Sequence, residues 1–261
     1  MVEPNRLIVK NVELSIGRLP EAFEGTSVAQ ISDIHFAEFL GADHLSDVVR
    51  QTNALRPDIV AFTGDLATRP GRDDSKIDKP AARKAVPAGP ILADLSAPLG
   101  RYAVLGNHDL TTDPGLMSEV LNQHGFKVLR NQTFPIERDG HRIWIAGIDD
   151  CLHGRGDVVG TLASIPNREQ AIVLVHEPDM ADMVAKHPVD VQLSGHSHGG
   201  QVRIPLIGAP ILPKLARKYP LGSYRIRNLQ LYTNPGVGVV GLPLRFDCPP
   251  EITLFTLRRD G

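Results

Sequence analysis

Short apolar runs recur along the chain, and each gives way to residues such as Gly, Asp, His or Asn. Runs of four to six residues rich in Val, Ile and Leu, bounded in this way, are typical of strands buried in the centre of a sheet. The pattern predicts six such strands, at Val28–Ile31, Ile59–Phe62, Tyr102–Leu105, Ile143–Ile148, Ala171–Val175 and Val189–Leu193.

Apolar residues at helical spacing predict two helices between these strands, over His44–Leu55 and Gly115–His124. Asp113 before Pro114 is predicted to cap the second helix, and Gly125 to end it. The last part of the chain predicts three further strands, at Ser223–Arg227, Leu229–Thr233 and Glu251–Leu257. The chain is therefore expected to have an α/β fold with strand-rich ends.

Two segments have no regular pattern. Thr68–Pro98 is rich in charge, Ala and Pro and is expected to form a loop followed by a helix. Ile204–Pro220 contains four prolines, which exclude a long regular element. Because we find no internal repeat, low-complexity tract or linker, residues 1–261 are expected to form a single domain.

Side chains that can bind metals follow the predicted strands. They lie in five segments, Asp33-Ile34-His35, Gly64-Asp65, Gly106-Asn107-His108-Asp109, His176-Glu177-Pro178 and Gly195-His196-Ser197-His198. Five of the ten histidines fall in these segments, which chance clustering does not explain. Since ligands of open α/β sheets bind beyond the carboxyl ends of strands, the segments predict one convergent polar site.

The residue types indicate what this site binds. Imidazole and carboxylate together suit Mn, Fe, Zn or Co, and the lack of nearby cysteine argues against a closed structural zinc site. Three or four such residues serve one metal, whereas six or seven can serve two. Asp65, beside a glycine at a strand end, suits a bridging position. Two cations about 3.5–4 Å apart can clamp the attacking and leaving oxygens of a phosphoryl displacement.

In this order, the segments D-x-H, G-D, G-N-H-D, H and G-H-x-H resemble the signature of the calcineurin-like metallophosphoesterase superfamily. The loop Gly195–Gln201 and the residues Leu244–Phe246 and Pro249–Ile252 are similar to a bacterial phosphodiesterase branch, often membrane-anchored. That branch includes a UDP-2,3-diacylglucosamine pyrophosphatase of lipid A biosynthesis. The resemblance implies a two-sheet β-sandwich flanked by helices, with the metal site at the strand ends.

The resemblance also implies a role for each matched residue. A first metal would be held by Asp33, His35 and His198, and a second metal by Asn107, His176 and His196. The Asp65 carboxylate would bridge the two metals. His108 would act on the substrate phosphate as an acid or charge stabiliser, and Asp109 would orient it. Two divalent cations, with Mn or Fe/Zn favoured, would activate a water that attacks phosphorus.

The expected reaction is hydrolysis of a phosphodiester or pyrophosphate bond, on a nucleotide-linked lipid such as UDP-2,3-diacylglucosamine. The alternative is a broad-specificity soluble phosphodiesterase or phosphatase. A weaker alternative is a non-catalytic binding scaffold on the same fold. Such scaffolds have typically lost metal ligands, whereas no signature position is substituted here.

Composition narrows the picture further. A chain that is 42% hydrophobic and 22% charged is globular, and its net charge of −2 gives no general attraction for nucleic acid. Cys151 and Cys248 are expected to be free thiols in a reducing compartment. The N-terminal residues show no signal-peptide core, and no apolar run approaches the ~20 residues of a membrane span. The expectation is a cytoplasmic protein, with peripheral contact at the inner membrane left open.

Charge is unevenly distributed along the chain. Between Asp190 and Asp247 there are seven Lys or Arg and no acidic residue, while the rest holds 21 Lys or Arg against 30 Asp or Glu. This window predicts either a basic surface facing an anionic partner or a solvated basic rim. It contains the apolar stretch Ile204–Pro213, followed by Lys214, Arg217 and Lys218. That stretch is expected either to form a flap for an acylated, anionic substrate at a membrane surface or to pack into the core.

The remaining polar residues have ordinary explanations. Five histidines are expected to be hydrogen-bonded structural residues: His44, His124, His141, His153 and His187. Asp149-Asp150 is expected either to line the mouth of the site or to form a charged turn.

Overall fold

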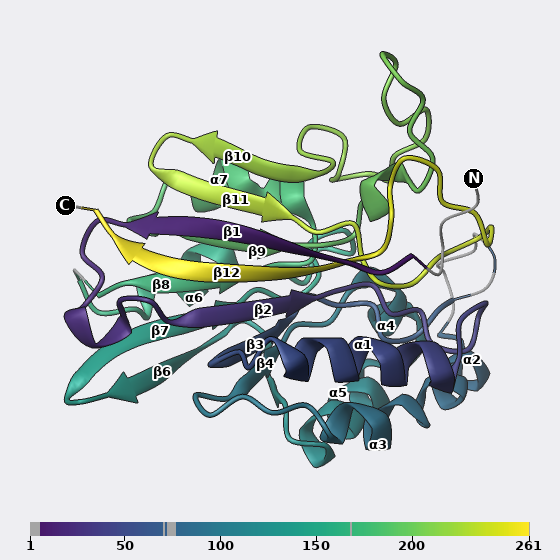
Figure 1. Cartoon of the computed structure of the whole chain (residues 1–261), viewed down its shortest axis with the longest axis horizontal. Helices are drawn as coiled ribbons and strands as arrows, with labels where there is room; N and C mark the ends of the chain where they lie inside the picture. The colour runs from purple at the N-terminus through teal and green to yellow at the C-terminus, as the bar shows by residue number, and fades with distance from the viewer. Residues whose placement is uncertain (1–5, 70, 72–76, 168, 261) are drawn as a thin grey trace.

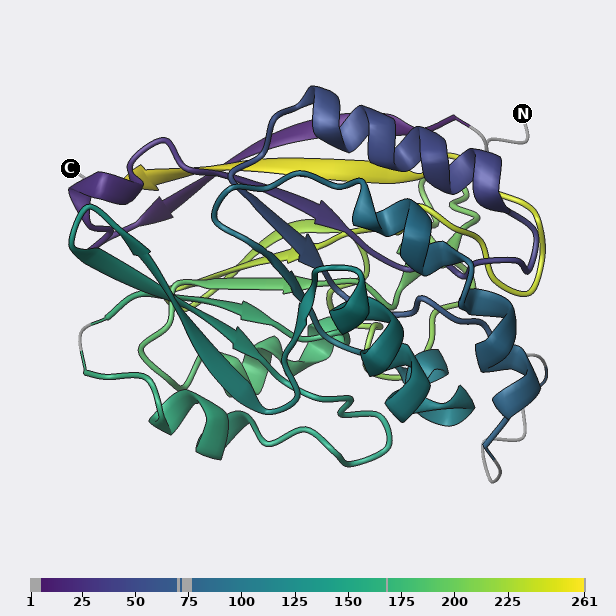
Figure 2. The ribbon, with the colours of Figure 1, turned by 90° about the horizontal axis from the view of Figure 1, so that it is seen from below.

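The computed structural model describes residues 6–69, 71, 77–167 and 169–260. Two six-stranded sheets lie face to face, and helices cover the outer face of each sheet (Figure 1, Figure 2). This helix–sheet–sheet–helix arrangement confirms the predicted α/β fold with two sheets flanked by helices.

The first sheet contains both ends of the described chain. Its spatial order is β1 (Ile8–Ile16), β12 (Glu251–Arg259), β2 (Ser27–Ile31), β3 (Ile59–Phe62), β4 (Arg101–Ala103) and β5 (Lys127–Val128). Only the β12–β2 pair is antiparallel. The polar segments after β2, β3 and β4 therefore emerge at the same edge.

The second sheet is built from the middle of the chain. Its spatial order is β10 (Gly222–Ile226), β11 (Leu229–Thr233), β9 (Val191–Ser194), β8 (Ala171–Leu174), β7 (His141–Gly147) and β6 (Gln132–Arg138). The outer pairs are antiparallel and the inner pairs parallel. The segments after β8 and β9 consequently meet those of the first sheet.

Seven α-helices connect the described strands. They are α1 (Ala42–Ala54), α2 (Lys79–Ala85), α3 (Ala88–Ala93), α4 (Asn107–Thr112), α5 (Pro114–Gln123), α6 (Val158–Ala163) and α7 (Ala181–Val184). The predicted cap of α5 is confirmed, because the Asp113 carboxylate accepts a hydrogen bond from Leu116 N–H at 3.1 Å. Three short 3₁₀ helices complete the described elements: η1 (Glu21–Phe23), η2 (Pro178–Met180) and η3 (His198–Gly200).

Three apolar clusters stabilise the layers. The cluster between the sheets includes Val28 and Phe255 of the first sheet and Ile145, Leu174 and Leu193 of the second. A second cluster joins the first sheet to α1, α3 and α5, and a third joins the other sheet to α6 and α7. The central strands are covered on both faces, which explains their continuous apolar sequences.

All nine predicted strands and both predicted helices are present, with ends shifted by a few residues. The sequence pattern did not predict β1, β5 or β6. In β1 the side chains of Val9, Lys10 and Asn11 are exposed, and the strand pairs with β12 from the opposite end of the chain. The segment Thr68–Pro98 contains two helices, α2 and α3, rather than one, and part of its loop lies outside the described residues.

An ion pair links the two sheets. Arg138 on β6 donates to the Asp58 carboxylate at 2.8 Å and to the Thr26 hydroxyl at 3.0 Å. Asp58 also accepts from the N–H and the hydroxyl of Ser27, each at 2.8 Å. Burial acts to raise the pKa of Asp58, but the Ser27 hydrogen bonds and the Arg138 charge outweigh it and lower that pKa.

We expect Asp58→Asn to lower the free energy of unfolding by about 1 kcal/mol at pH 7, a small value because solvent screens this half-exposed pair. A carboxyl whose pKa is lowered in the folded state stabilises the protein above its unfolded-state pKa. This contribution is lost as the pH falls through the folded-state pKa, below about 4. Urea unfolding of both proteins at pH 7 and pH 3 measures the effect, and an equal difference at both pH values contradicts it.

Candidate metal centre

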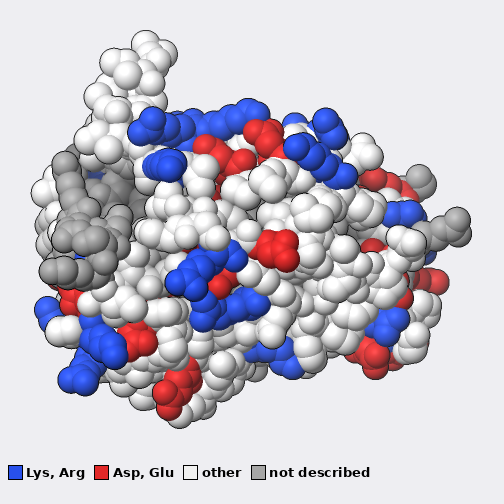
Figure 3. Space-filling view, turned by 180° about the vertical axis from the view of Figure 1, so that it is seen from behind, with Lys and Arg blue, Asp and Glu red and all other residues white. Residues whose placement is uncertain are grey.

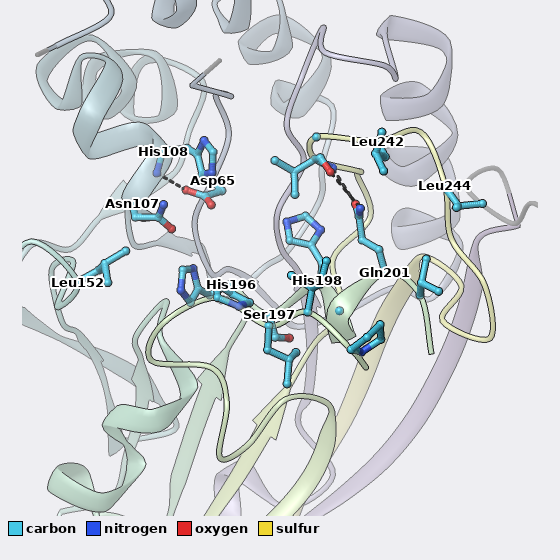
Figure 4. A pocket seen from close by; sticks show the side chains of 18 residues that line it. Asp65, Asn107, His108, Leu152, His196, Ser197, His198, Gln201, Leu242 and Leu244 are labelled. Carbon is cyan, nitrogen blue, oxygen red and sulfur yellow. Dashed lines mark hydrogen bonds between the residues drawn. The ribbon is translucent and has the colours of Figure 1, made fainter. Parts of the chain in front are cut away.

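The predicted site residues come together where central strands of the two sheets end (Figure 4). In the first sheet, β2 is followed by Asp33 and His35, β3 by Asp65, and β4 by Asn107, His108 and Asp109. In the second sheet, β8 is followed by His176, and β9 by His196 and His198. All are buried except Asn107 and His108, which are half-buried. The structure therefore brings every predicted site residue to one place.

The backbone at this site is unusual. Five residues have left-handed backbone angles: Asp33 (φ 51°), His35 (φ 48°), Asp65 (φ 61°), His196 (φ 67°) and His198 (φ 49°). Such angles are uncommon outside glycine and cost of order 1–3 kcal/mol unless the surroundings enforce them. Hydrogen bonds between the loops do so here, from Asp33 N–H to Gly64 C=O and from His35 N–H to Asp65 C=O.

Two glycines allow the loops to approach this closely. A Cβ on Gly106 would overlap the Asp65 carboxylate, and a Cβ on Gly195 would overlap Ser32 and the Asp33 carboxylate. The glycines of the G-N-H-D and G-H-x-H segments are therefore required by packing against metal-binding carboxylates.

The first group of candidate ligands is Asp33, His35 and His198, whose ligand atoms lie within 4.8 Å of one another. The Nε2 atoms of the two histidines are 3.0 Å apart, and His198 Nε2 is 3.3 Å from Asp33 Oδ1. Burial, together with His108, lowers the pKa of His35 to about 3, and burial and His35 lower the pKa of His198 well below its usual value. Neutral imidazoles facing a carboxylate are suited to holding a cation.

The second group is Asp65, His176 and His196, again with ligand atoms within 4.8 Å. His176 Nδ1 is 2.6 Å from Thr63 C=O, and His196 Nε2 is 2.9 Å from Lys214 C=O. A carbonyl only accepts hydrogen bonds, so these nitrogens carry protons and the other nitrogen of each ring is left as the ligand atom.

Asp65 lies between the two groups. Its Oδ2 atom is 3.1 Å from His176 Nε2 and 3.7 Å from His35 Nε2. Burial favours neutral His176, but the charge of Asp65, its hydrogen bond and Asp33 outweigh burial and raise the pKa of His176 well above its usual value. A proton on His176 Nε2 thus occupies the position that a cation would take. This geometry fits a carboxylate that bridges two cations.

Among the predicted site residues, two buried side-chain atoms have no hydrogen-bond partner in the described part of the chain, namely Asn107 Oδ1 and His198 Nδ1. An unsatisfied buried polar atom costs about 1–3 kcal/mol. A cation beside Asn107 Oδ1 would satisfy that oxygen, so the donor set fits divalent metal ions of the borderline type.

His108 occupies a different kind of position. Its Nδ1 accepts a hydrogen bond from Arg69 N–H at 2.9 Å, so a neutral ring carries its proton on Nε2. The ring lines the pocket (Figure 4). Its centroid is 4.9 Å from that of His35. His108 can therefore donate to a substrate oxygen.

Asp109 has a role that the sequence did not reveal. Its buried carboxylate accepts hydrogen bonds from Asp65 N–H and Ala67 N–H, each at 2.9 Å, and from Gly106 N–H at 3.1 Å. Burial and the Asp65 charge raise its pKa to about 7. Asp109 thus fixes the loop that carries Asp65, and its predicted action on His108 stays a prediction.

The sequence pattern did not identify the side chains that enclose the site. A pocket of about 420 Å³ lies over the metal ligands, with walls that include Leu152, Val240, Leu242 and Leu244. Gln201 fixes one wall, since its amide donates to Val240 C=O at 3.0 Å and accepts from Val240 N–H at 2.7 Å (Figure 4). The motif Gly195–Gln201 contained this residue, but nothing in the sequence indicated its partner.

Other polar residues lie outside the pocket. Asp149 pairs with Arg130 at 2.7 Å, and Asp150 accepts from His153; this matches a charged turn. Arg245, which the charge window suggested as a surface residue, is fully buried and donates to backbone carbonyls, including that of Cys248. Cys151 and Cys248 are free thiols, as predicted.

Comparison with known proteins agrees with this site. Residues 26–200 match the family model for calcineurin-like phosphoesterases. The chain is 36% identical to the metallophosphoesterase YkuE of Bacillus subtilis, covering 98% of this chain and 87% of that protein. It is 29% identical to phosphodiesterase YaeI of Escherichia coli (87% and 80% covered). It is 28% identical to the UDP-2,3-diacylglucosamine pyrophosphatase LpxG of Chlamydia trachomatis (97% and 90% covered).

A sandwich of two sheets with buried imidazole and carboxylate ligands at its strand ends defines a metal-dependent phosphoric ester hydrolase. The chain belongs to the calcineurin-like phosphoesterase family, which confirms the resemblance seen in the motifs.

The bridging position of Asp65 can be tested by Asp65→Asn. The amide keeps the hydrogen bond from His108 N–H (2.8 Å) but removes the negative charge between the two ligand groups. We expect bound metal to fall by about one ion per chain and turnover to fall by more than 100-fold, without unfolding. Elemental analysis and circular dichroism check this, with exposed Asp94→Asn as the control. Unchanged metal content and rate would exclude a bridging role.

The role of His108 can be tested by His108→Ala. We expect unchanged metal content and a turnover reduced by about 10²–10⁴-fold, because the lost group acts on the substrate rather than on the metals. A larger loss for poor leaving groups indicates a general acid, and an equal loss indicates a charge stabiliser. His141→Ala, at the exposed first residue of β7, is the control. Loss of metal from the His108 variant would contradict both roles.

Proposed function

We propose that this protein hydrolyses a phosphodiester or pyrophosphate bond in a nucleotide-linked lipid, such as UDP-2,3-diacylglucosamine, with two divalent cations. The observation that carries the proposal is the two-sided pocket. One end presents Asp65, Asn107 and His108, and the other end is walled by apolar side chains. Its volume of about 420 Å³ is in the range of small-molecule sites.

The apolar walls come from three separate segments of the chain. They are formed by Leu152 after β7, by Val202 and Pro210–Pro213 after η3, and by Val240, Leu242 and Leu244 before β12. A hydrolase of water-soluble phosphodiesters needs no such walls beside its metal ligands. An acyl chain would gain about 0.8 kcal/mol for each methylene that leaves water for these walls.

The residues of the site divide the catalytic work. When bound, divalent cations act as Lewis acids that activate water and neutralise charge on the phosphoryl group. Asp33, His35 and His198 would hold one cation, while Asn107, His176 and His196 would hold the other, with Asp65 between them. The buried carboxylates keep their geometry through backbone N–H donors, such as His196 N–H to Asp33 at 3.1 Å.

His108 acts on the opposite side of the phosphate. Its Nε2–H donates to a phosphoryl oxygen or to the leaving oxygen as the bond to phosphorus breaks. The leaving group departs with this proton, and the attacking water supplies the new oxygen on phosphorus. Because water is the nucleophile, no serine or cysteine nucleophile is required. Cys151 is also unsuited to that role, since burial and nearby carboxylates raise the pKa of its thiol far above the neutral range.

The relatives support the bond type and the lipid class. YaeI is named as a phosphodiesterase and LpxG as a pyrophosphatase of a diacylated sugar nucleotide. No described helix is long and apolar enough to cross a bilayer. A diacylated substrate resides in a membrane, so the proposal includes peripheral contact between this protein and that membrane.

A series of nucleotide diphosphate esters with acyl chains of increasing length tests the lipid proposal. We expect kcat/KM to rise at least about tenfold for every two methylenes until the pocket is filled, as burial of about 0.8 kcal/mol per methylene requires. Leu242→Ser with Leu244→Ser should flatten this rise, and should lower kcat/KM much more for the long-chain ester than for bis-p-nitrophenyl phosphate. Val159→Ser, on exposed α6, is the matched control.

A kcat/KM that does not depend on chain length would contradict the lipid proposal. With bis-p-nitrophenyl phosphate still hydrolysed, the protein would then be a broad-specificity phosphodiesterase.

A further inference from the structure

A hairpin formed by residues 202–212 stands away from the body of the protein (Figure 1). Its outer turn is closed by hydrogen bonds between Ile204 and Gly208, from N–H to C=O in both directions, at 2.9 and 2.8 Å. Its base is fixed by a bond from Arg203 N–H to Phe246 C=O at 2.9 Å. The hairpin is therefore a formed element and not a loose connection.

The tip of the hairpin is apolar and faces water. Leu206 is fully exposed, and the side chains of Ile207 and Ile211 are 74% and 79% exposed. Of the two expectations for this stretch, packing into the core is thus wrong for these residues. Leu206 also has φ 69°, a left-handed angle that is costly for a branched apolar residue. The fold holds large apolar side chains outward at this point, which favours an apolar partner.

Basic side chains surround the base of the hairpin. Lys214 and Arg217 are exposed, and Arg217 lies beside Pro210 and Ile211. No acidic residue occurs between positions 190 and 247. Figure 3 shows the outer part of the protrusion without charged side chains, and Lys and Arg next to its base, with some Asp and Glu close by. An apolar tip above a basic base is complementary to a bilayer with anionic headgroups.

The inner side of the same hairpin forms a wall of the pocket. Pro210, Ile211 and Leu212 line the cavity that reaches Asp65 and His108. Ile211 belongs to both surfaces, because it is mostly exposed and also lines the pocket. An acyl chain could therefore pass from a bilayer around the tip into the pocket without crossing water.

We propose that hairpin 202–212 inserts Leu206 and Ile207 into the surface of an anionic bilayer, with Lys214 and Arg217 at the headgroups. This orientation holds the pocket mouth against the membrane. The inference deepens the proposed function by assigning the element that contacts the membrane. Binding to vesicles can be measured without substrate, so the two proposals can fail separately.

Co-sedimentation with vesicles tests the contact. We expect wild type to bind phosphatidylcholine vesicles containing 30% phosphatidylglycerol at least tenfold more tightly than pure phosphatidylcholine, and to be weakened by 0.5 M NaCl. Leu206→Ser with Ile207→Ser should weaken binding at least tenfold, and Lys214→Gln with Arg217→Gln should abolish the preference for anionic vesicles. Val159→Ser with Met183→Ser, two exposed apolar residues elsewhere, should bind as wild type does.

A tryptophan at the tip reports insertion directly. The emission of Leu206→Trp should shift to the blue and become protected from acrylamide on anionic vesicles, whereas that of Val159→Trp should not. The inference is overturned if wild type ignores anionic vesicles, if the tip and control variants bind alike, or if the Leu206→Trp emission does not change.

Activity separates this inference from the proposed function. Vesicle binding without any acyl-chain dependence of hydrolysis would support the hairpin contact and remove the lipid substrate. Chain-length-dependent hydrolysis in detergent without vesicle binding would support the substrate and remove the hairpin contact. Both hairpin variants should keep wild-type rates on bis-p-nitrophenyl phosphate, because Leu206, Ile207, Lys214 and Arg217 do not line the pocket.

Discussion

The rest of the structure depends on one constraint, the burial of several carboxylates and imidazoles where strands of the two sheets end. Asp33, Asp65 and Asp109 lie within one buried cluster with four histidines. Burial and the Asp65 charge raise the pKa of Asp33 to about 6, although the His176 charge and hydrogen bonds from Ser32 and His196 act to lower it. Several ionised carboxylates close together in a protein interior are costly in free energy when nothing neutralises them. Divalent cations between them would offset that cost. The site is therefore built to be completed by metal.

The scaffold holds these groups in place with its backbone. Left-handed residues in the loops after β2, β3 and β9 turn the ligands inward, and hydrogen bonds between loops keep that geometry. Buried Arg245 has a comparable role behind the site, because its guanidinium donates to the carbonyls of Pro235, Gly238 and Cys248. The Cys248 thiol in turn donates to His198 C=O, with Sγ 3.3 Å from the oxygen. The segment before β12 is thereby fixed relative to η3.

The candidate metal ligands and the apolar walls of the pocket lie in different parts of the fold. Short loops at strand ends carry the metal ligands, and the longer segments after η3 and before β12 carry the apolar walls and the hairpin. Gln201 connects the two, since it follows the ligand His198 and holds Val240.

The sequence by itself determined the central strands, the fold class and the candidate metal ligands that the structure brings together, because buried strands have continuous apolar runs and metal ligands are restricted to a few residue types at their ends. It could not determine β1, whose exposed side chains acquire meaning only when β12 pairs with it across the whole chain. Nor could it place Arg245 in the interior, or decide whether Ile204–Pro213 was core or surface. Those outcomes depend on contacts between segments distant in sequence, so only the tertiary structure decided them. Leucine lines the pocket at position 212 and faces water at position 206, although both residues belong to the same apolar stretch.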